Sequence, residues 1–84
     1  MRLELKNDLI FKDGAPLPYF PKVKVFAIGP YRETELTHCV MADDVTGEYE
    51  RFVTGADGRA VYFPEIDGAK TERGTARLRI ELTP

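Results

Sequence analysis

Glycine and proline recur along the chain so closely that they exclude a long helix. Seven glycines and six prolines stand among 84 residues. No stretch of about eleven residues keeps apolar side chains at helical spacing without one of them interrupting it. Residues of this kind instead separate short strands, which usually run for about five or six residues. We therefore expect an all-β fold.

Three segments alternate polar and apolar side chains, which is the period of a strand with one buried face. They are residues 2–6, 22–27 and 76–82. Two further segments, 35–41 and 48–54, carry β-branched and aromatic residues that sheets favour. We interpret all five as strands.

Turn sequences predict how some of these strands pair. Asp57-Gly58 lies between two apolar runs, and an Asp-Gly pair tolerates the positive φ angles of a tight hairpin. We expect strands 48–54 and 59–63 to pair antiparallel across it. The turn-rich segment 43–47 predicts a second hairpin, between strand 48–54 and the strand before it. Three consecutive strands would then form a meander.

Two segments break the strand pattern. Residues 13–21 contain three prolines beside Tyr19 and Phe20, so they cannot donate a full ladder of hydrogen bonds and predict a Pro-rich N-terminal arm or an edge segment. Residues 65–74 hold five charged residues and two glycines, which predicts a solvated, mobile loop. The whole chain, 1–84, is expected to be one small antiparallel β-sandwich of about six or seven strands.

Length and composition limit what such a domain can do. A chain of 84 residues buries only about 60% of its unfolded surface, so its apolar residues must serve one thin core. The sequence contains no serine, glutamine or tryptophan, which removes serine nucleophiles. Its net charge of -2 argues against nucleic acid as a partner, because phosphate binding depends on clusters of Lys and Arg. We expect the protein not to be an enzyme, unless copies share an active site at an interface.

The sequence also indicates in which cellular compartment the protein is made. Cys39 is the single cysteine, so no disulfide forms within the chain and a reducing environment suits it. The first residues lack the apolar run of a signal peptide, and no run approaches the roughly 18 residues of a membrane span. We expect synthesis in the cytoplasm and no membrane partner, with a virion as one candidate destination.

Parts of the chain resemble a known family of modules. Residues 44–47 read D-V-T-G, residues 54–63 read T-G-A-D-G-R-A-V-Y-F, and Pro64 and an alternating strand at 75–82 follow. This order is similar to the small transthyretin-like or immunoglobulin-like β-sandwich modules grouped with carboxypeptidase regulatory domains. The resemblance implies a β-sandwich with a non-catalytic role, and it brings no active-site residue to this chain.

Two groups of side chains could suggest chemistry. His38 stands beside Cys39, but neighbouring residues of a strand point to opposite faces, so the imidazole cannot reach the thiol. One His and one Cys also fall two ligands short of a structural zinc site. Carboxylates crowd the 43–48 turn without the spacing of a calcium loop, although a weakly bound surface cation remains an alternative there. We expect no metal and no cofactor.

The candidate contact residues are aromatic or basic. Tyr19, Phe20 and Tyr31 lie in Pro-rich sequence outside the expected strands, where aromatic side chains either fold back onto the core or stand exposed as interface anchors. Residues 33–50 hold six acids and no Lys or Arg, whereas 70–79 is rich in bases. This distribution predicts an acidic and a basic pole that steer association; the alternative is a mixed surface that keeps the domain dissolved. The basic candidates are Lys70, Arg73, Arg77 and Arg79.

These observations favour a structural or protein-interaction module that self-associates or binds a protein partner. By analogy of class, a small disulfide-free β domain suits an accessory or decoration subunit of a larger assembly, such as a phage-like particle or tail. The alternative is a β-sandwich that binds a small ligand or a carbohydrate through the loops 43–47 and 65–74.

Overall fold

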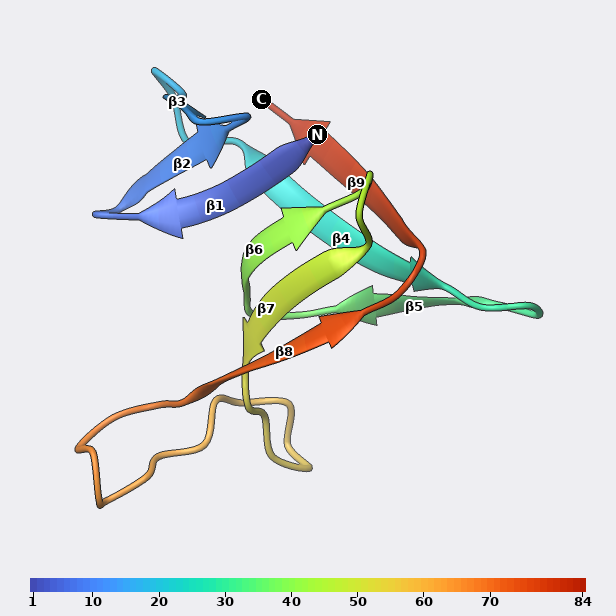
Figure 1. Ribbon diagram of the computed structural model, residues 1–84. Coiled ribbons are helices and arrows are strands. Elements are labelled where there is room, and N and C mark those ends of the chain that lie inside the picture. Colours follow the sequence, from blue (N-terminus) through green and yellow to red (C-terminus); the bar gives the residue numbers. More distant parts are fainter.

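The computed structural model describes residues 1–84 and contains nine strands and no helix (Figure 1). The strands form two antiparallel sheets, a large one in the order β3-β2-β1-β6-β7-β8 and a small one in the order β5-β4-β9. The expected all-β sandwich is confirmed, with more strands than expected. In chain order the strands are β1 (Arg2–Lys6), β2 (Leu9–Lys12), β3 (Ala15–Pro16), β4 (Lys22–Ile28), β5 (Glu33–Leu36), β6 (Cys39–Asp43), β7 (Glu48–Phe52), β8 (Thr71–Thr75) and β9 (Leu78–Thr83).

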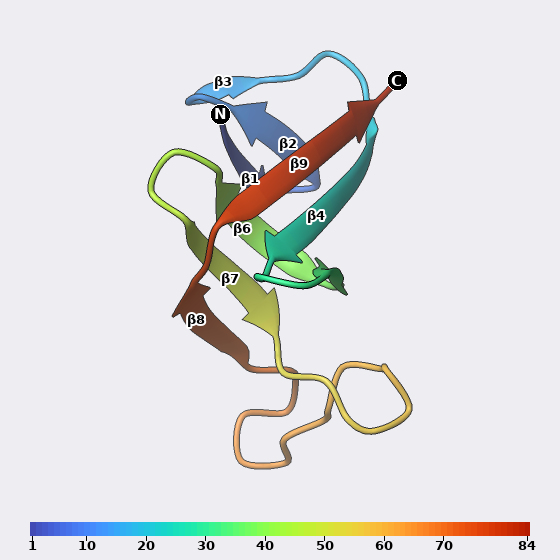
Figure 2. The same ribbon diagram turned by 90° about the vertical axis from the view of Figure 1, so that its right-hand side faces the viewer.

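The core lies where the two sheets meet. Val25 of β4, Ala42 of β6 and Leu78 of β9 form its buried centre, and Tyr49 of β7 packs against them. Figure 2 shows β4 and β9 lying across β6 and β7. Only 9 of the 84 residues are buried, so this core is thin, as the length of the chain requires.

The chain crosses from the small sheet to the large sheet at residues 37–38. We expected one strand over 35–41, but β5 ends at Leu36 and β6 begins at Cys39, in different sheets. Between them His38 adopts a φ of 61°, outside the strand region of backbone space. The continuous strand is therefore wrong, because one left-handed residue redirects the backbone without altering the pattern of side chains around it.

Two tight hairpins at the start of the chain were missing from the sequence-based assignment. Asn7 and Asp8 join β1 to β2 with φ angles of 49° and 60°, and Asp13 and Gly14 join β2 to β3 with 51° and 87°. Positive φ at both central residues suits the right-handed twist of paired strands. Within the segment expected to be an arm or an edge, residues 15–16 form β3, which is one edge of the large sheet.

The turn at Asp57-Gly58 forms, but the long hairpin expected around it does not. Gly58 has a φ of 77°, and the Gly55 N–H donates to the Arg59 carbonyl at 2.9 Å. Beyond the turn, pairing is limited to the Thr54–Ala60 bridge and one hydrogen bond from Val61 to Val53. Residues 59–63 are thus not a strand of the sheet, and that prediction is wrong.

The partner of β7 is β8, which lies within and just beyond the segment expected to be a mobile loop. Glu50 faces Arg73 and Arg51 faces Glu72 along this ladder. Opposite charges directly across an antiparallel pair stabilise the pairing. Charged residues that predict a solvated loop on their own therefore form an edge strand here, and the loop prediction is wrong from Thr71 onward.

The turn between β6 and β7 is fastened to the junction between β8 and β9. The Asp43 carboxylate accepts hydrogen bonds from the Val45 and Thr46 amides at 2.9 and 3.2 Å. Gly47 closes the turn with a φ of 79°, and its carbonyl accepts a hydrogen bond from the Ala76 amide at 2.9 Å. A Cβ atom at position 47 would overlap the carbonyl oxygen of Ala76.

Replacing two glycines of similar φ separates backbone strain from this steric overlap. Gly58→Ala should cost about 1 kcal/mol of unfolding free energy, because position 58 has a positive φ and open space around it. Gly47→Ala should cost about 3 kcal/mol or more, because the overlap with the Ala76 backbone adds to the same strain. Urea denaturation of both variants measures the difference; equal losses would contradict the close approach at position 47.

Acid should weaken the fold through Asp43. The hydrogen bonds from Val45 and Thr46 lower the pKa of its carboxyl group, so the folded chain binds this proton less tightly than the unfolded chain. The contribution of the ionised Asp43 carboxylate to the stability of the fold is fully present above the unfolded pKa of about 4. It is lost as the pH falls through the lower pKa of the folded state. We expect Asp43→Asn to be less stable than the wild type at pH 7. The difference in their free energies of unfolding, measured by urea titration, should shrink as the pH falls toward 2.5. A gap independent of pH would contradict this role.

Candidate functional site

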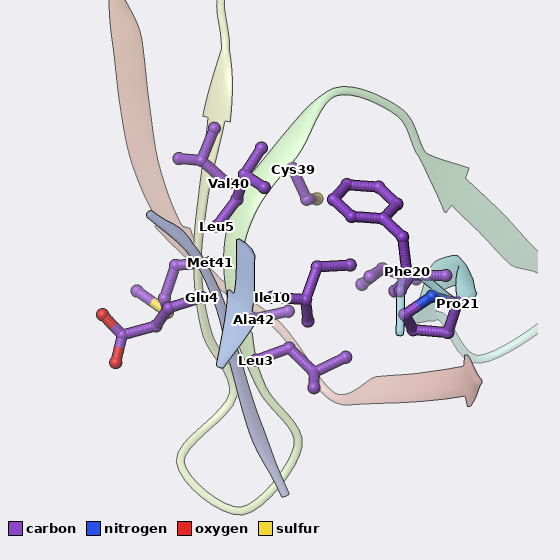
Figure 3. Close-up of a pocket in the computed structure, with 12 residues that line it drawn as sticks. Leu3, Glu4, Leu5, Ile10, Phe20, Pro21, Cys39, Val40, Met41 and Ala42 are labelled. Atoms are coloured by element: carbon purple, nitrogen blue, oxygen red, sulfur yellow. The ribbon is translucent and has the colours of Figure 1, made fainter. Parts of the chain in front are cut away.

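An apolar groove opens between the sheets beside the N-terminal hairpin (Figure 3). Its volume is about 230 Å³, and ten of its twelve lining residues are hydrophobic. In Figure 3, Phe20 and Pro21 lie on one side and face Leu3 and Ile10 on the other. The single charged lining residue, Glu4, points away from this space.

The groove exists because a segment without regular structure, rather than a strand, covers the β1–β2 hairpin. The large sheet has six strands and the small sheet three, so the small sheet leaves part of the apolar face uncovered. The Leu17 amide donates to the Ile10 carbonyl at 2.8 Å and ties this segment to β2. At the rim, the exposed fractions are 66% for Phe20 and 43% for Leu5.

The three predicted aromatic contact residues are all exposed, but they do not gather at one place. Phe20 lies at the groove, and Tyr19, the residue before it, is 47% exposed. Tyr31 is 97% exposed and lies in the turn between β4 and β5, at the far end of β4. Figure 1 shows this turn on the opposite side of the molecule from the N-terminal hairpins. Only Phe20 of the three lines the groove.

The predicted basic residues are paired rather than collected into a pole. Arg73 binds Glu50 at 2.8 Å and Arg79 binds Glu33 at 2.6 Å, and these contacts lower the pKa values of both glutamates. Acids from 33–50 and bases from 70–79 thus neutralise one another, Arg73–Glu50 between the neighbouring strands β8 and β7 and Arg79–Glu33 across β4. The expectation of two separate poles is wrong, because distance along the sequence is not distance in the sheet.

The two remaining basic candidates lie elsewhere. Lys70 binds Glu65 at 2.6 Å and places its ammonium group 4.5 Å from the centre of the Phe63 ring. Arg77 is exposed in the short connection between β8 and β9. The four bases therefore form no single surface with Phe20.

The loops proposed to hold a ligand lie too far apart to act together. The 43–47 turn leads into the start of β7 at Glu48, and the loop at 65–70 leads into β8, whose first residue pairs with Phe52 at the end of β7. The two loops thus occupy opposite ends of β7, as Figure 1 shows. A ligand gripped by the 43–47 turn and the 65–70 loop together is inconsistent with this arrangement, whereas residues 71–74 of the expected 65–74 loop belong to β8 and run back along β7 toward the turn.

His38 and Cys39 do not form a catalytic pair. The His38 Nε2 lies 2.9 Å from the Gly58 carbonyl oxygen, whereas the Cys39 thiol donates weakly to the Leu36 carbonyl at 3.5 Å. Burial raises the pKa of the Cys39 thiol, and only the positive charge of Arg51 opposes that effect. A protonated, half-buried thiol is a poor nucleophile at neutral pH. No group of three or more His, Cys, Asp or Glu side chains is arranged to hold a metal ion.

The strand residues that build the groove, chiefly Leu5 and Ile10, were not predicted as site residues. The turn at Asn7-Asp8 between two apolar runs was the available signal. Arg51 was not predicted either. Its Nη2 donates to the Thr37 and Thr54 hydroxyls at 3.3 and 3.4 Å, while its Nε is buried without a partner.

Comparison of the chain with known protein families, with curated proteins and with solved structures finds no match. The resemblance to transthyretin-like and immunoglobulin-like modules therefore stays a prediction. The structure holds no helix that could span a membrane.

Alkylation kinetics should confirm that Cys39 is inert. We expect iodoacetamide at about pH 7.5 to modify Cys39 much more slowly in the folded chain than in denaturant, because burial raises the thiol pKa. His38→Ala should leave the folded rate unchanged, since the imidazole contacts Gly58 rather than the thiol. Mass spectrometry of timed samples measures both rates; fast modification that His38→Ala abolishes would reveal an activated pair.

Proposed function

We propose that this protein is a non-enzymatic interaction module whose apolar groove receives an apolar segment of a protein partner. The observation that carries the proposal is the continuous apolar lining, with Phe20 and Leu5 exposed at its rim. An aromatic side chain that stays exposed beside a hydrophobic hollow has the character of an interface anchor. Binding would bury both rim residues and complete a core that the small sheet leaves partly open.

The composition of the groove favours this role over catalysis or sugar binding. Active sites bring several polar groups to one point, and carbohydrate sites need side chains that donate and accept hydrogen bonds. Here the one charged lining residue, Glu4, is held by Arg2 and Lys6 at 3.2 and 3.1 Å. The volume of about 230 Å³ is also below the roughly 300 Å³ at which small-molecule pockets begin.

A place in a larger assembly fits such a module. A thin sandwich with one apolar docking groove gains stability when a partner covers that groove, because burial on binding adds apolar contact that the isolated domain lacks. We therefore propose an accessory or decoration subunit, with a phage-like particle or tail as one candidate assembly. The alternative is a small apolar ligand in the same groove.

Photo-cross-linking from inside the groove tests the proposal. Benzoylphenylalanine in place of Phe20, in the cells that make the protein, should cross-link to one protein species. The same substitution at Tyr31, which is exposed and outside the groove, is the matched control. A synthetic peptide with the sequence of the cross-linked segment should then bind the isolated chain. Phe20→Ala should raise the Kd for this peptide by about tenfold or more.

The outcomes separate the candidates. A cross-link that Leu5→Lys abolishes supports a protein segment in the groove. Equal, unspecific labelling from positions 20 and 31 contradicts the proposal. A small molecule that co-purifies with the wild type and is lost in Leu5→Lys would identify the groove as a ligand site instead.

A further inference from the structure

Strand β9 presents a free edge of the small sheet. It pairs with β4 on one side, and Figure 2 shows no strand of the small sheet on its other side. The Ile28 amide donates to the Arg77 carbonyl at 2.8 Å, and the groups that face the partner alternate along an antiparallel ladder. The backbone groups of Arg79 and Glu81 therefore face β4. Those of Leu78, Ile80 and Leu82 point outward.

The other three strand edges carry features that discourage pairing with a second copy. Edge β3 has two residues and includes Pro16, which cannot donate a hydrogen bond. In any two-fold pairing of β5, a glutamate at position 33 or 35 faces another glutamate. Pairing β8 with itself about its central residue places Arg73 opposite Arg73. Like charges directly opposite destabilise a strand pair.

The sequence of β9 is self-complementary in one register. When two copies pair antiparallel about Ile80, Leu78 of each copy faces Leu82 of the other, and Arg79 of each faces Glu81 of the other. The outward backbone groups of Leu78, Ile80 and Leu82 then meet as hydrogen-bonded pairs. Shifting the register to the next allowed alignment places Arg79 opposite Arg79 or Glu81 opposite Glu81. Charge thus selects a single alignment.

Arg79 lies on the outer face of the small sheet, the face on which this register brings positions 79 and 81 of the two copies together. Its guanidinium binds both Glu33 of β5 and Glu81 of its own strand, at 2.6 and 2.5 Å, and lies 4.3 Å from the centre of the Phe26 ring of β4. These contacts turn the side chain toward β4 and β5, so in the dimer its guanidinium exchanges its own Glu81 for Glu81 of the other copy. On the opposite face, Leu78 and the half-buried Ile80 belong to the core.

We propose that β9 is a homodimerisation edge, at which two copies pair their β9 strands antiparallel about a two-fold axis at Ile80. The two three-stranded sheets become one sheet of six strands, and the contact closes on itself because both copies use the same surface. None of the groove-lining residues lies on β9. The dimer edge therefore goes beyond the proposed groove function and does not depend on it.

Charge exchange at positions 79 and 81 tests the register. Sedimentation equilibrium of the wild type should show a reversible species of twice the 9.5 kDa chain mass. Arg79→Glu and Glu81→Arg should each weaken dimerisation by about tenfold or more, since each creates two like-charge pairs. An equimolar mixture of the two variants should form a heterodimer, because every facing pair then has opposite charges, and the doubly exchanged chain should regain the wild-type homodimer. Lys12→Glu, on β2, is the control and should leave dimerisation unchanged.

Hydrogen exchange gives a second readout that needs no variant. The amides of Ile80 and Leu82 should gain protection as the wild-type concentration rises, whereas the amides of Arg73 and Thr75 on the β8 edge should not. Three results would each overturn the proposal. The wild type could stay monomeric at millimolar concentration, the charge exchanges could leave the dimer affinity unchanged, or the protein could form oligomers that grow without limit. Circular dichroism melts show whether a variant is folded. If position 20 gives no specific cross-link while the wild type still dimerises, the groove function alone is refuted.

Discussion

Close approach of the two sheets at Ala42 determines the shape of the rest of the molecule. With a single methyl group as its side chain, Ala42 lets β6 lie against Val25 and Leu78 of the small sheet. Twisted sheets that touch at one point separate away from it. Tyr49 fills the space toward β8, where its ring lies over Gly74. On the other side Leu3, Ile10 and Phe20 face one another without filling the space between the sheets, and the space that remains is the groove.

The sequence predicts the parts of this fold that depend on local alternation and fails where a distant partner decides. The segments 2–6, 22–27 and 76–82 become β1, β4 and β9, nearly within the expected bounds. In contrast, β8 becomes a strand only because β7 offers Glu50 and Arg51 opposite its own charges. Nothing within 71–75 carries that information.

The site was predictable to a similar extent. Phe20 was identified from its Pro-rich surroundings, and it does lie at the groove. Its neighbours Leu5 and Ile10 were not identified, since the hollow arises from the mismatch between a six-stranded and a three-stranded sheet. Whether a residue lines the groove depends on how the two sheets overlap. The polar and apolar pattern of one strand does not carry that information.

The pairing of β4 with β9 has a consequence for the order in which the chain can acquire its structure. During synthesis β4 and β5 emerge long before β9, and their hairpin exposes Val23 and Val25 until the last strand arrives. Contacts between segments so remote in sequence form slowly, because a long loop must close first. The small sheet is therefore complete only when a strand remote in sequence has joined its central strand β4.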